Sequence, residues 1–498
     1  MASYRFVSAR KEANFDECAE MTVGNGIYTA KLTGPTGKGN GLCGNAHLSL
    51  NNRIGMGDKF EELRKEENVR IFHDDIETDL MIDAFHECDI DHRILQNLRR
   101  TGIMKPTAVQ RATLPIMIEQ PDRDVIVQAE TGSGKTAAYL IPIICNIQSR
   151  KKRGQCAPPN SPFSVIIAPT RELAGQIAHE ARVISEGVGV SVALTYGQMP
   201  MSNCRQDIRE GCDILVATPG RLIGHYEERS VQFQSVQWVV LDEADQMFEY
   251  SLGQFVVPFL KEIKQNMNCR LFAFSATFTE GVLSTITTQY VEPHFYLITG
   301  RASPKEHIKQ KFIEVKGREK KTVLIHVMNH IILKGNRETP RGQRWRIPKT
   351  IIFVDTKFET NFLAIYLTNM NIPCISFNGD RTQLMREKAI DDFSRGRCAV
   401  MVCTNVCARG LNMKDIEYVV NYDIPIKCQE MYMHRIGRTG RAGNIGRAYT
   451  FFEIGRDEKN AEDVMQMIED CGLEVPEFIA KHVANNVATR QAGVFHQN

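Results

Sequence analysis

Hydrophobic positions gather along the chain in two series of short runs, each followed by polar residues and a longer helical pattern. The first series is DVIVQ at 124, SVIIA at 164, SVALT at 191, DILVA at 213, WVVLD at 238 and LFAFS at 271. The second series is TIIFV at 350, PCISF at 373, CAVMVCT at 398, YVVNY at 418 and AYTFF at 448. Runs that are apolar at nearly every position are typical of parallel strands covered by helices on both faces. The pattern therefore predicts an α/β protein of two tandem units, each a mostly parallel sheet flanked by helices.

Polar stretches separate and surround the two series. We expect a disordered N-terminal extension over residues 1–80, which is partly rich in Gly and Asn. The remaining boundaries predict an N-terminal domain over 81–299, a linker over 300–307, a C-terminal domain over 308–480 and a polar tail over 481–498. Within the second unit, residues 334–349 are basic and contain proline, which favours a surface loop.

Composition narrows the class of protein without indicating its activity. The chain has 498 residues, which suits two domains with extensions, and its 43% hydrophobic and 24% charged content is typical of globular proteins. It has neither an apolar run long enough to cross a membrane nor a signal-peptide pattern at its start, so we expect a soluble intracellular protein. Its 14 cysteines lack the paired spacing of a zinc site, which favours reduced thiols. A net charge of +2 neither requires nor excludes a nucleic-acid partner.

A glycine-containing loop follows the run at 124 and precedes an apolar helical pattern. In that order, strand, loop and helix form the setting of a phosphate-binding loop. Gly132 and Gly134 would let backbone N–H groups face the phosphates, Lys135 would reach the β- and γ-phosphates, and Thr136 would bind Mg²⁺. Because the first position of the general pattern is alanine, the motif is a variant. The predicted loop comprises Ala129, Glu130, Thr131, Gly132, Ser133, Gly134, Lys135 and Thr136.

Two adjacent carboxylates, Asp242 and Glu243, lie at the end of the run WVVLD. The carboxyl ends of parallel strands are where open α/β sheets bind ligands. Taken with the phosphate loop, this position predicts that Asp242 holds Mg²⁺ and that Glu243 positions and deprotonates the water that attacks the γ-phosphorus. An acidic turn without such a loop would more often be a solvated surface feature.

Seven short motifs occur in an order and spacing that resemble the DEAD-box RNA helicases. They are AETGSGKT at 129, PTREL at 169, TPGRL at 218, DEAD at 242, SAT at 275, ARGLN at 408 and HRIGRTGR at 434. The resemblance covers about residues 81–480, and the strings YMHRIGRTGRAGNIGRAYTFF and CGLEVPEF look most similar to the Vasa/Ded branch. It implies two RecA-like domains that bind ATP and RNA across the cleft between them and unwind or remodel short RNA duplexes and RNA–protein complexes.

The resemblance also implies roles for residues around the nucleotide. Phe85 would stack on the adenine and Gln110 would pair with its edge, which selects ATP. Arg438 and Arg441 would act as arginine fingers at the γ-phosphate. Gly410 and Asn412 would lie near the ribose. The residues that would couple hydrolysis to RNA binding are Asp245, Ser275, Thr277, His434 and Arg435.

By the same resemblance, backbone amides, hydroxyls and arginines of both units would line single-stranded RNA. Few of these groups can recognise a base, so low sequence specificity is expected, and contacts to sugar hydroxyls would favour RNA over DNA. The predicted RNA positions are Pro169, Thr170, Arg171, Gly197, Thr218, Pro219, Gly220 and Arg221 in the first unit, and Gly379, Gln383, Arg386, Thr404 and Arg409 in the second.

Two positions depart from the family pattern. Gly197 is followed by Gln198 where the family has a second glycine, and Asn412 replaces an aspartate that would bind the ribose. The loss of that charge leaves two hypotheses open: a working helicase, which the intact catalytic set favours, or an ATP-gated RNA clamp with attenuated hydrolysis. A DNA translocase is a third and weaker alternative. By resemblance the partners are single-stranded RNA, short duplexes and components of RNA–protein granules, with no membrane, and the protein would be a monomer in the cytoplasm or in perinuclear RNA granules.

Overall fold

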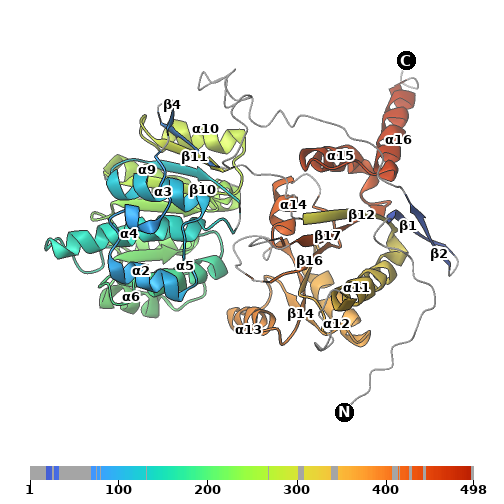
Figure 1. The fold of residues 1–498 in the computed structure, drawn as a ribbon, viewed down its shortest axis with the longest axis horizontal. Coiled ribbons are helices and arrows are strands. Elements are labelled where there is room, and N and C mark those ends of the chain that lie inside the picture. Colours follow the sequence, from blue (N-terminus) through green and yellow to red (C-terminus); the bar gives the residue numbers. More distant parts are fainter. Residues whose placement is uncertain are drawn as a thin grey trace, which may run out of the picture. The chain divides into compact units, whose positions relative to one another are not determined.

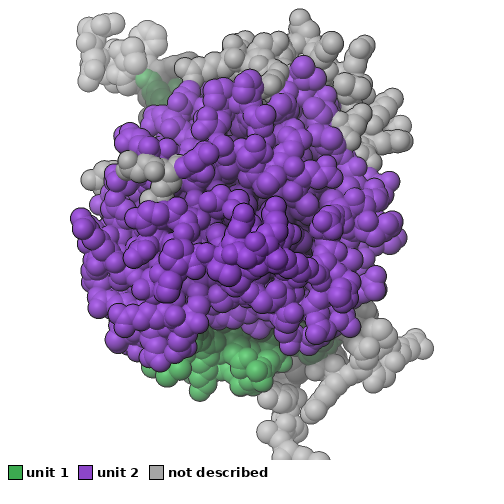
Figure 2. All heavy atoms as spheres, turned by 90° about the vertical axis from the view of Figure 1, so that its left-hand side faces the viewer, with its two compact units in different colours: residues 1–43, 304–409, 413–498 green, residues 44–303, 410–412 purple. Residues whose placement is uncertain are grey.

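The chain divides into two compact units, which are coloured separately in Figure 2. Unit 2 comprises residues 44–303 and 410–412, and unit 1 comprises 1–43, 304–409 and 413–498. The boundary between Ser303 and Pro304 falls inside the stretch predicted as a linker. The computed structural model describes residues 18–24, 27–32, 69–73, 76–78, 80–130, 132–248, 250–266, 268–300, 308–337, 346–405, 413, 415–425, 429–440 and 445–494.

Unit 2 is built on a nine-stranded sheet in the described residues, with the strand order β4-β3-β11-β5-β10-β9-β6-β8-β7. Figure 1 labels β4, β10 and β11 of this sheet. Its strands pair in parallel, except that β3 runs antiparallel to both β11 and β4. The strands are β3 (Val69–His73), β4 (Ile76–Thr78), β5 (Val125–Gln128), β6 (Ser164–Ile167), β7 (Val192–Thr195), β8 (Ile214–Ala217), β9 (Trp238–Asp242), β10 (Arg270–Ser275) and β11 (Tyr296–Gly300).

Helices cover both faces of this sheet, which explains why its central strands β5, β6 and β8 are almost entirely apolar. In β5, Val125 and Val127 belong to one hydrophobic cluster while Ile126 belongs to the other. Both clusters are therefore part of one two-sided core, as the sequence pattern predicts. The elements are η1 (Phe85–Glu87), α2 (His92–Arg100), α3 (Ala108–Glu119), α4 (Lys135–Lys152), α5 (Arg171–Ile184), α6 (Met201–Glu210), α7 (Pro219–Glu227), α8 (Ala244–Met247), α9 (Tyr250–Asn266) and α10 (Glu280–Gln289).

Unit 1 contains a six-stranded sheet whose described pairings are all parallel, in the order β12-β17-β16-β13-β15-β14. A separate antiparallel pair, β1 (Cys18–Gly24) and β2 (Ile27–Leu32), lies near the start of the chain. The sheet strands are β12 (Ile308–Lys316), β13 (Thr350–Phe353), β14 (Cys374–Phe377), β15 (Val400–Cys403), β16 (Tyr418–Asn421) and β17 (Gly446–Ile454). The helices are η2 (Gly317–Glu319), α11 (Lys320–Arg337), α12 (Lys357–Asn369), α13 (Gln383–Ser394), α14 (Gln429–Ile436), η4 (Glu458–Asn460), α15 (Ala461–Asp470) and α16 (Glu477–Val494).

The two units, each a mostly parallel sheet with flanking helices, confirm the predicted fold class. Three boundaries differ from those expected from the sequence. Strands β3 and β4 precede residue 81, because the buried Val69 and Ile71 give residues 69–73 an apolar side that extends the sheet beside β11. Helix α16 continues to Val494 through the predicted polar tail. Helix α11 runs to Arg337, into the start of the predicted basic loop, whose residues 338–345 lie outside the described residues. Among the helices that the structure describes, none combines the length and the apolar character needed to span a membrane.

Candidate nucleotide and nucleic-acid site

Three of the predicted motifs meet at one edge of the unit 2 sheet. Strands β5, β10 and β9 are neighbours, and their ends are in register, with Gln128 opposite Ser275 and Phe274 opposite Asp242. The phosphate loop, the Ser275 turn and the Asp242 turn therefore leave the sheet side by side at its carboxyl edge. That edge is where ligands bind in open parallel sheets.

The phosphate loop depends on glycine at two positions. Gly132 and Gly134 have φ values of 88° and 91°, in the left-handed region that favours glycine. Gly134 is the N-cap of α4, and no side chain caps that helix, so its first N–H groups stay available to an anion. Within the loop, Ser133 Oγ donates to the Glu130 carbonyl over 2.7 Å and Lys135 Nζ donates to the Ala129 carbonyl. Thr131 lies outside the described residues.

Gln110 braces this loop from α3. Its Nε2 donates to the Gly134 carbonyl over 3.0 Å, and its Oε1 accepts from the Thr107 backbone N–H over 3.1 Å. A Cβ at Gly134 would lie 2.5 Å from Gln110 Nε2, so the contact also requires glycine. Phe85 and Gln110 are only 7% and 2% exposed, and Phe85 packs in the hydrophobic core. Their recognition of adenine stays a prediction.

Asp242 is a buried carboxylate with a donor on each oxygen. Its Oδ1 accepts from the Glu243 backbone N–H over 3.0 Å, and its Oδ2 accepts from the Tyr139 hydroxyl over 2.9 Å. Burial raises the pKa of Asp242, and the positive charge of Lys135 acts in the opposite direction. Burial also raises the pKa of Tyr139 well above its ordinary value, so the phenol stays protonated and donates. A carboxylate and the hydroxyl of Thr136 are oxygen ligands of the kind that Mg²⁺ prefers, and a cation would offset the burial of the Asp242 carboxylate.

Glu243 follows in a strained conformation. Its φ of 54° and ψ of 55° are left-handed, which is uncommon for a residue other than glycine and costs about 1–3 kcal/mol. Its carboxylate accepts a hydrogen bond from Gln246 Nε2, one turn along the chain. The backbone strain and this bond together fix the direction of the predicted water-positioning side chain.

Asp245 and Ser275 join the acidic turn to the end of β10. Ser275 Oγ donates to Asp245 Oδ1 over 2.7 Å, and both residues are at most 4% exposed. The Ser275 carbonyl in turn accepts from the Ala129 N–H over 2.9 Å, and the Thr277 N–H donates to Ser275 Oγ over 3.4 Å. Ser275 therefore connects the carboxylates with the start of the phosphate loop, which is the contact that the proposed coupling role needs.

The predicted RNA positions of unit 2 follow β6, β7 and β8, which are neighbours on the far side of β9. Thr170 caps α5, since its Oγ1 accepts from the Leu173 N–H over 3.3 Å. Thr218 is the N-cap of α7 but makes no side-chain cap, and because Pro219 has no N–H, the Gly220 N–H is the donor that this helix start can offer. The residues of this edge are Pro169, Thr170, Arg171, Gly197, Thr218, Pro219, Gly220 and Arg221.

The loop after β7 lies close to two arginines. Arg221 Nη2 donates to the Met199 carbonyl over 2.6 Å, and a Cβ on Gly197 would lie 3.4 Å from Arg171 Nη2. Between them, Gln198 is exposed and has a φ of 75°, again in the left-handed region. The departure from the family's glycine pair thus places a glutamine in a backbone conformation that suits glycine.

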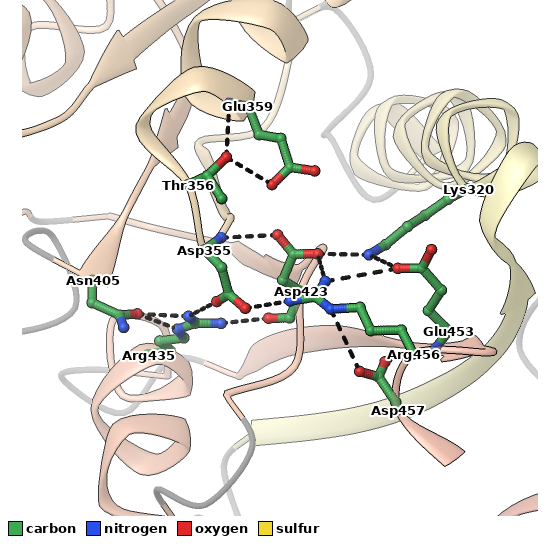
Figure 3. A network of polar contacts seen from close by, with 10 residues as sticks. All are labelled: Lys320, Asp355, Thr356, Glu359, Asn405, Asp423, Arg435, Glu453, Arg456 and Asp457. Atoms are coloured by element: carbon green, nitrogen blue, oxygen red, sulfur yellow. Dashed lines mark hydrogen bonds and ion pairs between the residues drawn. The ribbon is translucent and has the colours of Figure 1, made fainter. Parts of the chain in front are cut away.

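In unit 1, a network of charged side chains, some of them buried, occupies the carboxyl ends of β13 and β16 (Figure 3). Arg435 is fully buried and donates to Asn405 Oδ1 over 2.8 and 2.6 Å and to Asp355 Oδ1 over 3.2 Å. From α11, Lys320 reaches Asp423 Oδ1, also over 2.6 Å. The network connects α14, whose last turn contains the start of the HRIGRTGR motif, to the ends of both strands. Its other members are Thr356, Glu359, Glu453, Arg456 and Asp457.

Sequence reasoning missed most of this network, and it missed Tyr139. Asp355 and Asp423 each come at the end of an apolar strand pattern, in TIIFVD and YVVNYD, as Asp242 does in WVVLD. A carboxylate at the end of a predicted strand could therefore have indicated these two residues as well. Lys320 and Tyr139 had no such signal, because their partners lie 103 residues away in both cases.

Arg438 is buried at 1% exposure, and its Nε donates to the His434 carbonyl over 3.2 Å, with His434 itself 3% exposed. The structure therefore folds this predicted arginine finger back onto α14. Arg441, Arg409, Gly410 and Asn412 lie outside the described residues.

The remaining predicted RNA positions of unit 1 are described. Gln383 begins α13 and accepts a hydrogen bond from Arg386, while it donates to Glu387 Oε1 over 3.0 Å. Gly379 follows β14, and Thr404 follows β15 at the same edge of the sheet.

Taken together, a phosphate-loop unit followed by a second α/β unit with an arginine-bearing helix defines a nucleotide-dependent protein of the two-domain helicase class. The DEAD/DEAH box helicase family profile matches residues 107–285, and the helicase conserved C-terminal domain profile matches residues 337–443. The chain belongs to the DEAD-box helicase family.

Known relatives and solved structures are similar over most of the chain. The chain is 34% identical to the ATP-dependent RNA helicase vasa of Drosophila melanogaster and 33% identical to the probable ATP-dependent RNA helicase DDX4 of Homo sapiens, over 80% of its own length in each case. It spans 57% and 53% of these relatives, just over half of each. Among solved structures, the chain is similar to Saccharomyces cerevisiae Dbp5 bound to RNA and ADP BeF3, with a TM-score of 0.66 and 26% identity. The match covers 80% of the present chain and 100% of the Dbp5 chain. Mss116p bound to single-stranded RNA and AMP-PNP covers 82% of both chains, with a TM-score of 0.69 and 26% identity.

Proposed function

We propose that the protein is an ATP-dependent RNA helicase that binds single-stranded RNA without sequence preference and unwinds or remodels short RNA duplexes and RNA–protein complexes. The observation that carries the proposal is the meeting of the phosphate loop, Asp242 and Ser275 at one sheet edge, beside the cluster of helix starts and arginines after β6, β7 and β8. The relatives named as ATP-dependent RNA helicases support it.

Different residues of unit 2 would bind the phosphates, bind Mg²⁺ and orient the attacking water. The N–H groups at the start of α4 and the Lys135 ammonium would hold the phosphates, and Thr136 and Asp242 would hold Mg²⁺. When bound, Mg²⁺ would offset the negative charge of the phosphates and of the hydrolytic transition state. Glu243 would orient a water molecule for in-line attack and accept its proton.

Coupling to RNA would run through Ser275. Its hydrogen bond to Asp245 and its backbone bond to Ala129 would transmit the state of the nucleotide to the rest of the edge. Arg438 and Arg441 would serve as arginine fingers when ATP and RNA bring the two units together. Because Arg438 is turned toward His434 in this structure, we expect it to change its rotamer in that step.

Further parts of the proposal rest on family resemblance. The partners would be single-stranded RNA, short duplexes and components of RNA–protein granules, and the protein would act as a monomer. The expected location is the cytoplasm, including perinuclear RNA granules.

The test is Glu243→Gln, which removes the water-orienting carboxylate and leaves the phosphate contacts in place. With ATP and Mg²⁺, this variant should remain on fluorescent single-stranded RNA much longer than the parent, because hydrolysis no longer resets the complex. Lys135→Ala should show no ATP-dependent RNA binding, whereas Lys261→Ala, at an exposed lysine of α9, should behave like the parent. Equal RNA dissociation rates for Glu243→Gln and the parent would contradict the proposed function.

A further inference from the structure

Tyr139 is placed by α4 between the phosphate loop and Asp242. It follows Lys135 by one helical turn and so shares its face of the helix. Its side chain is fully buried, its ring contacts Phe274 edge-on with centroids 5.1 Å apart, and its hydroxyl donates to Asp242 Oδ2 over 2.9 Å. The ring is therefore locked by β10 and the hydroxyl by β9.

This hydrogen bond decides how the Asp242 carboxylate is oriented. The Glu243 N–H holds Oδ1 and the Tyr139 hydroxyl holds Oδ2, so the carboxylate plane is fixed from both sides. Each carboxylate oxygen can accept more than one hydrogen bond, which leaves capacity on both for a cation or its water shell. The donor on Oδ2 comes from the same helix as Thr136, the other oxygen ligand assigned to Mg²⁺. The bond therefore sets the position of one ligand relative to the other.

A second buried tyrosine of unit 2 carries a hydroxyl without such a bond. Tyr290 is 1% exposed, and its hydroxyl has no hydrogen-bond partner in the part of the chain that the structure describes. Removing its hydroxyl changes the same atom type in the same unit without touching the sheet edge. Tyr290→Phe is thus a matched control for Tyr139→Phe.

We propose that the Tyr139 hydroxyl is a positioning group that holds the Asp242 carboxylate in the orientation required for the divalent cation of the nucleotide site. The inference rests on the proposed function, since it assigns a further residue to the same site. A phenylalanine at this position would fill nearly the same space and leave Oδ2 without its buried donor. The carboxylate could then rotate, and the site would bind the cation more weakly.

The experiment measures binding of a fluorescent ATP analogue to the full chain as a function of Mg²⁺ concentration. In Tyr139→Phe the Mg²⁺ concentration for half-maximal binding should rise about tenfold, the size expected for one lost hydrogen bond to a charged group. Nucleotide affinity measured in EDTA should be unchanged, and Tyr290→Phe should match the parent in both measurements.

The half-maximal Mg²⁺ concentration is taken within one preparation, so it does not depend on the folded fraction of the variant. A half-maximal Mg²⁺ concentration in Tyr139→Phe equal to that of the parent would overturn the role of the hydroxyl. Absence of any Mg²⁺-dependent nucleotide binding by the parent would instead overturn the proposed function, and the inference with it.

Discussion

Replacing Gln198 with glycine should stabilise unit 2. Gln198 has a φ of 75°, and its side chain is exposed in the loop between β7 and α6. An L-residue in the left-handed conformation costs about 1–2 kcal/mol, because its Cβ approaches the following carbonyl oxygen. Glycine avoids that contact but loses about 0.5–1 kcal/mol through the larger freedom of the unfolded chain. The difference predicts a net gain of about 0.5–1 kcal/mol, or roughly 2 °C in Tm for a domain of this size.

The measurement is urea unfolding of the full chain, followed by the fluorescence of Trp238, which is buried in β9. The chain has two tryptophans, so Trp345→Phe is introduced into every protein compared, and the signal then reports unit 2 alone. Gln198→Ala keeps the left-handed strain and removes the carboxamide, so it should not stabilise. The matched control is Gln232→Gly, at an exposed glutamine without positive φ, and it should destabilise by about 0.5–1 kcal/mol.

A Gln198→Gly variant that is no more stable than the parent would refute this reasoning, because it would show that the loop carries no strain that glycine relieves. The same variants also test why a glutamine is present. If the carboxamide contacts RNA, both Gln198→Gly and Gln198→Ala should lose RNA affinity, although only the first gains stability.

Two further predictions concern buried polar groups. Lys320→Met should destabilise unit 1 by about 3 kcal/mol or more, because the buried Asp423 carboxylate loses one of its cationic partners. Lys357→Met, at an exposed ion pair, should destabilise it by less than about 1 kcal/mol. Hydrogen exchange of the β13 and β16 amides measures both changes. Burial lowers the pKa of His225 to about 4, so the stability contributed by its neutral form is present above pH 6.5 and is lost as the pH falls toward 4. The unfolding free energy should fall over that window by up to about 1.4 kcal/mol per pH unit, and this part of the slope should vanish in His225→Gln; an unchanged slope would contradict the assignment.

The strands, and the meeting of the candidate nucleotide-site motifs at one sheet edge, could be predicted because both depend on neighbours in sequence. The run WVVLD is apolar at its first four positions because β9 is covered on both faces, and the carboxylates at its end must lie at the carboxyl edge. The glycines of the phosphate loop are likewise visible, since their φ values near 90° restrict the residue type.

What the sequence did not reveal depends on partners that are distant along the chain. The Tyr139 hydroxyl looked like part of an apolar helix face, and only the fold places it against Asp242. Strands β3 and β4 were hidden because a five-residue apolar pattern is diluted by the polar composition of residues 1–80. The left-handed backbone at Gln198 could not be predicted, because glutamine is not a residue type that favours positive φ.

The central claim, that the unit 2 sheet edge couples ATP hydrolysis to RNA, is tested most directly by steady-state ATP hydrolysis with and without single-stranded RNA. The parent should hydrolyse ATP slowly alone and many times faster with saturating RNA, and DNA of the same sequence should stimulate it little. Lys135→Ala should abolish both rates, while Lys261→Ala should retain them. Hydrolysis that RNA does not stimulate, or stimulation that survives in Lys135→Ala, would contradict the account.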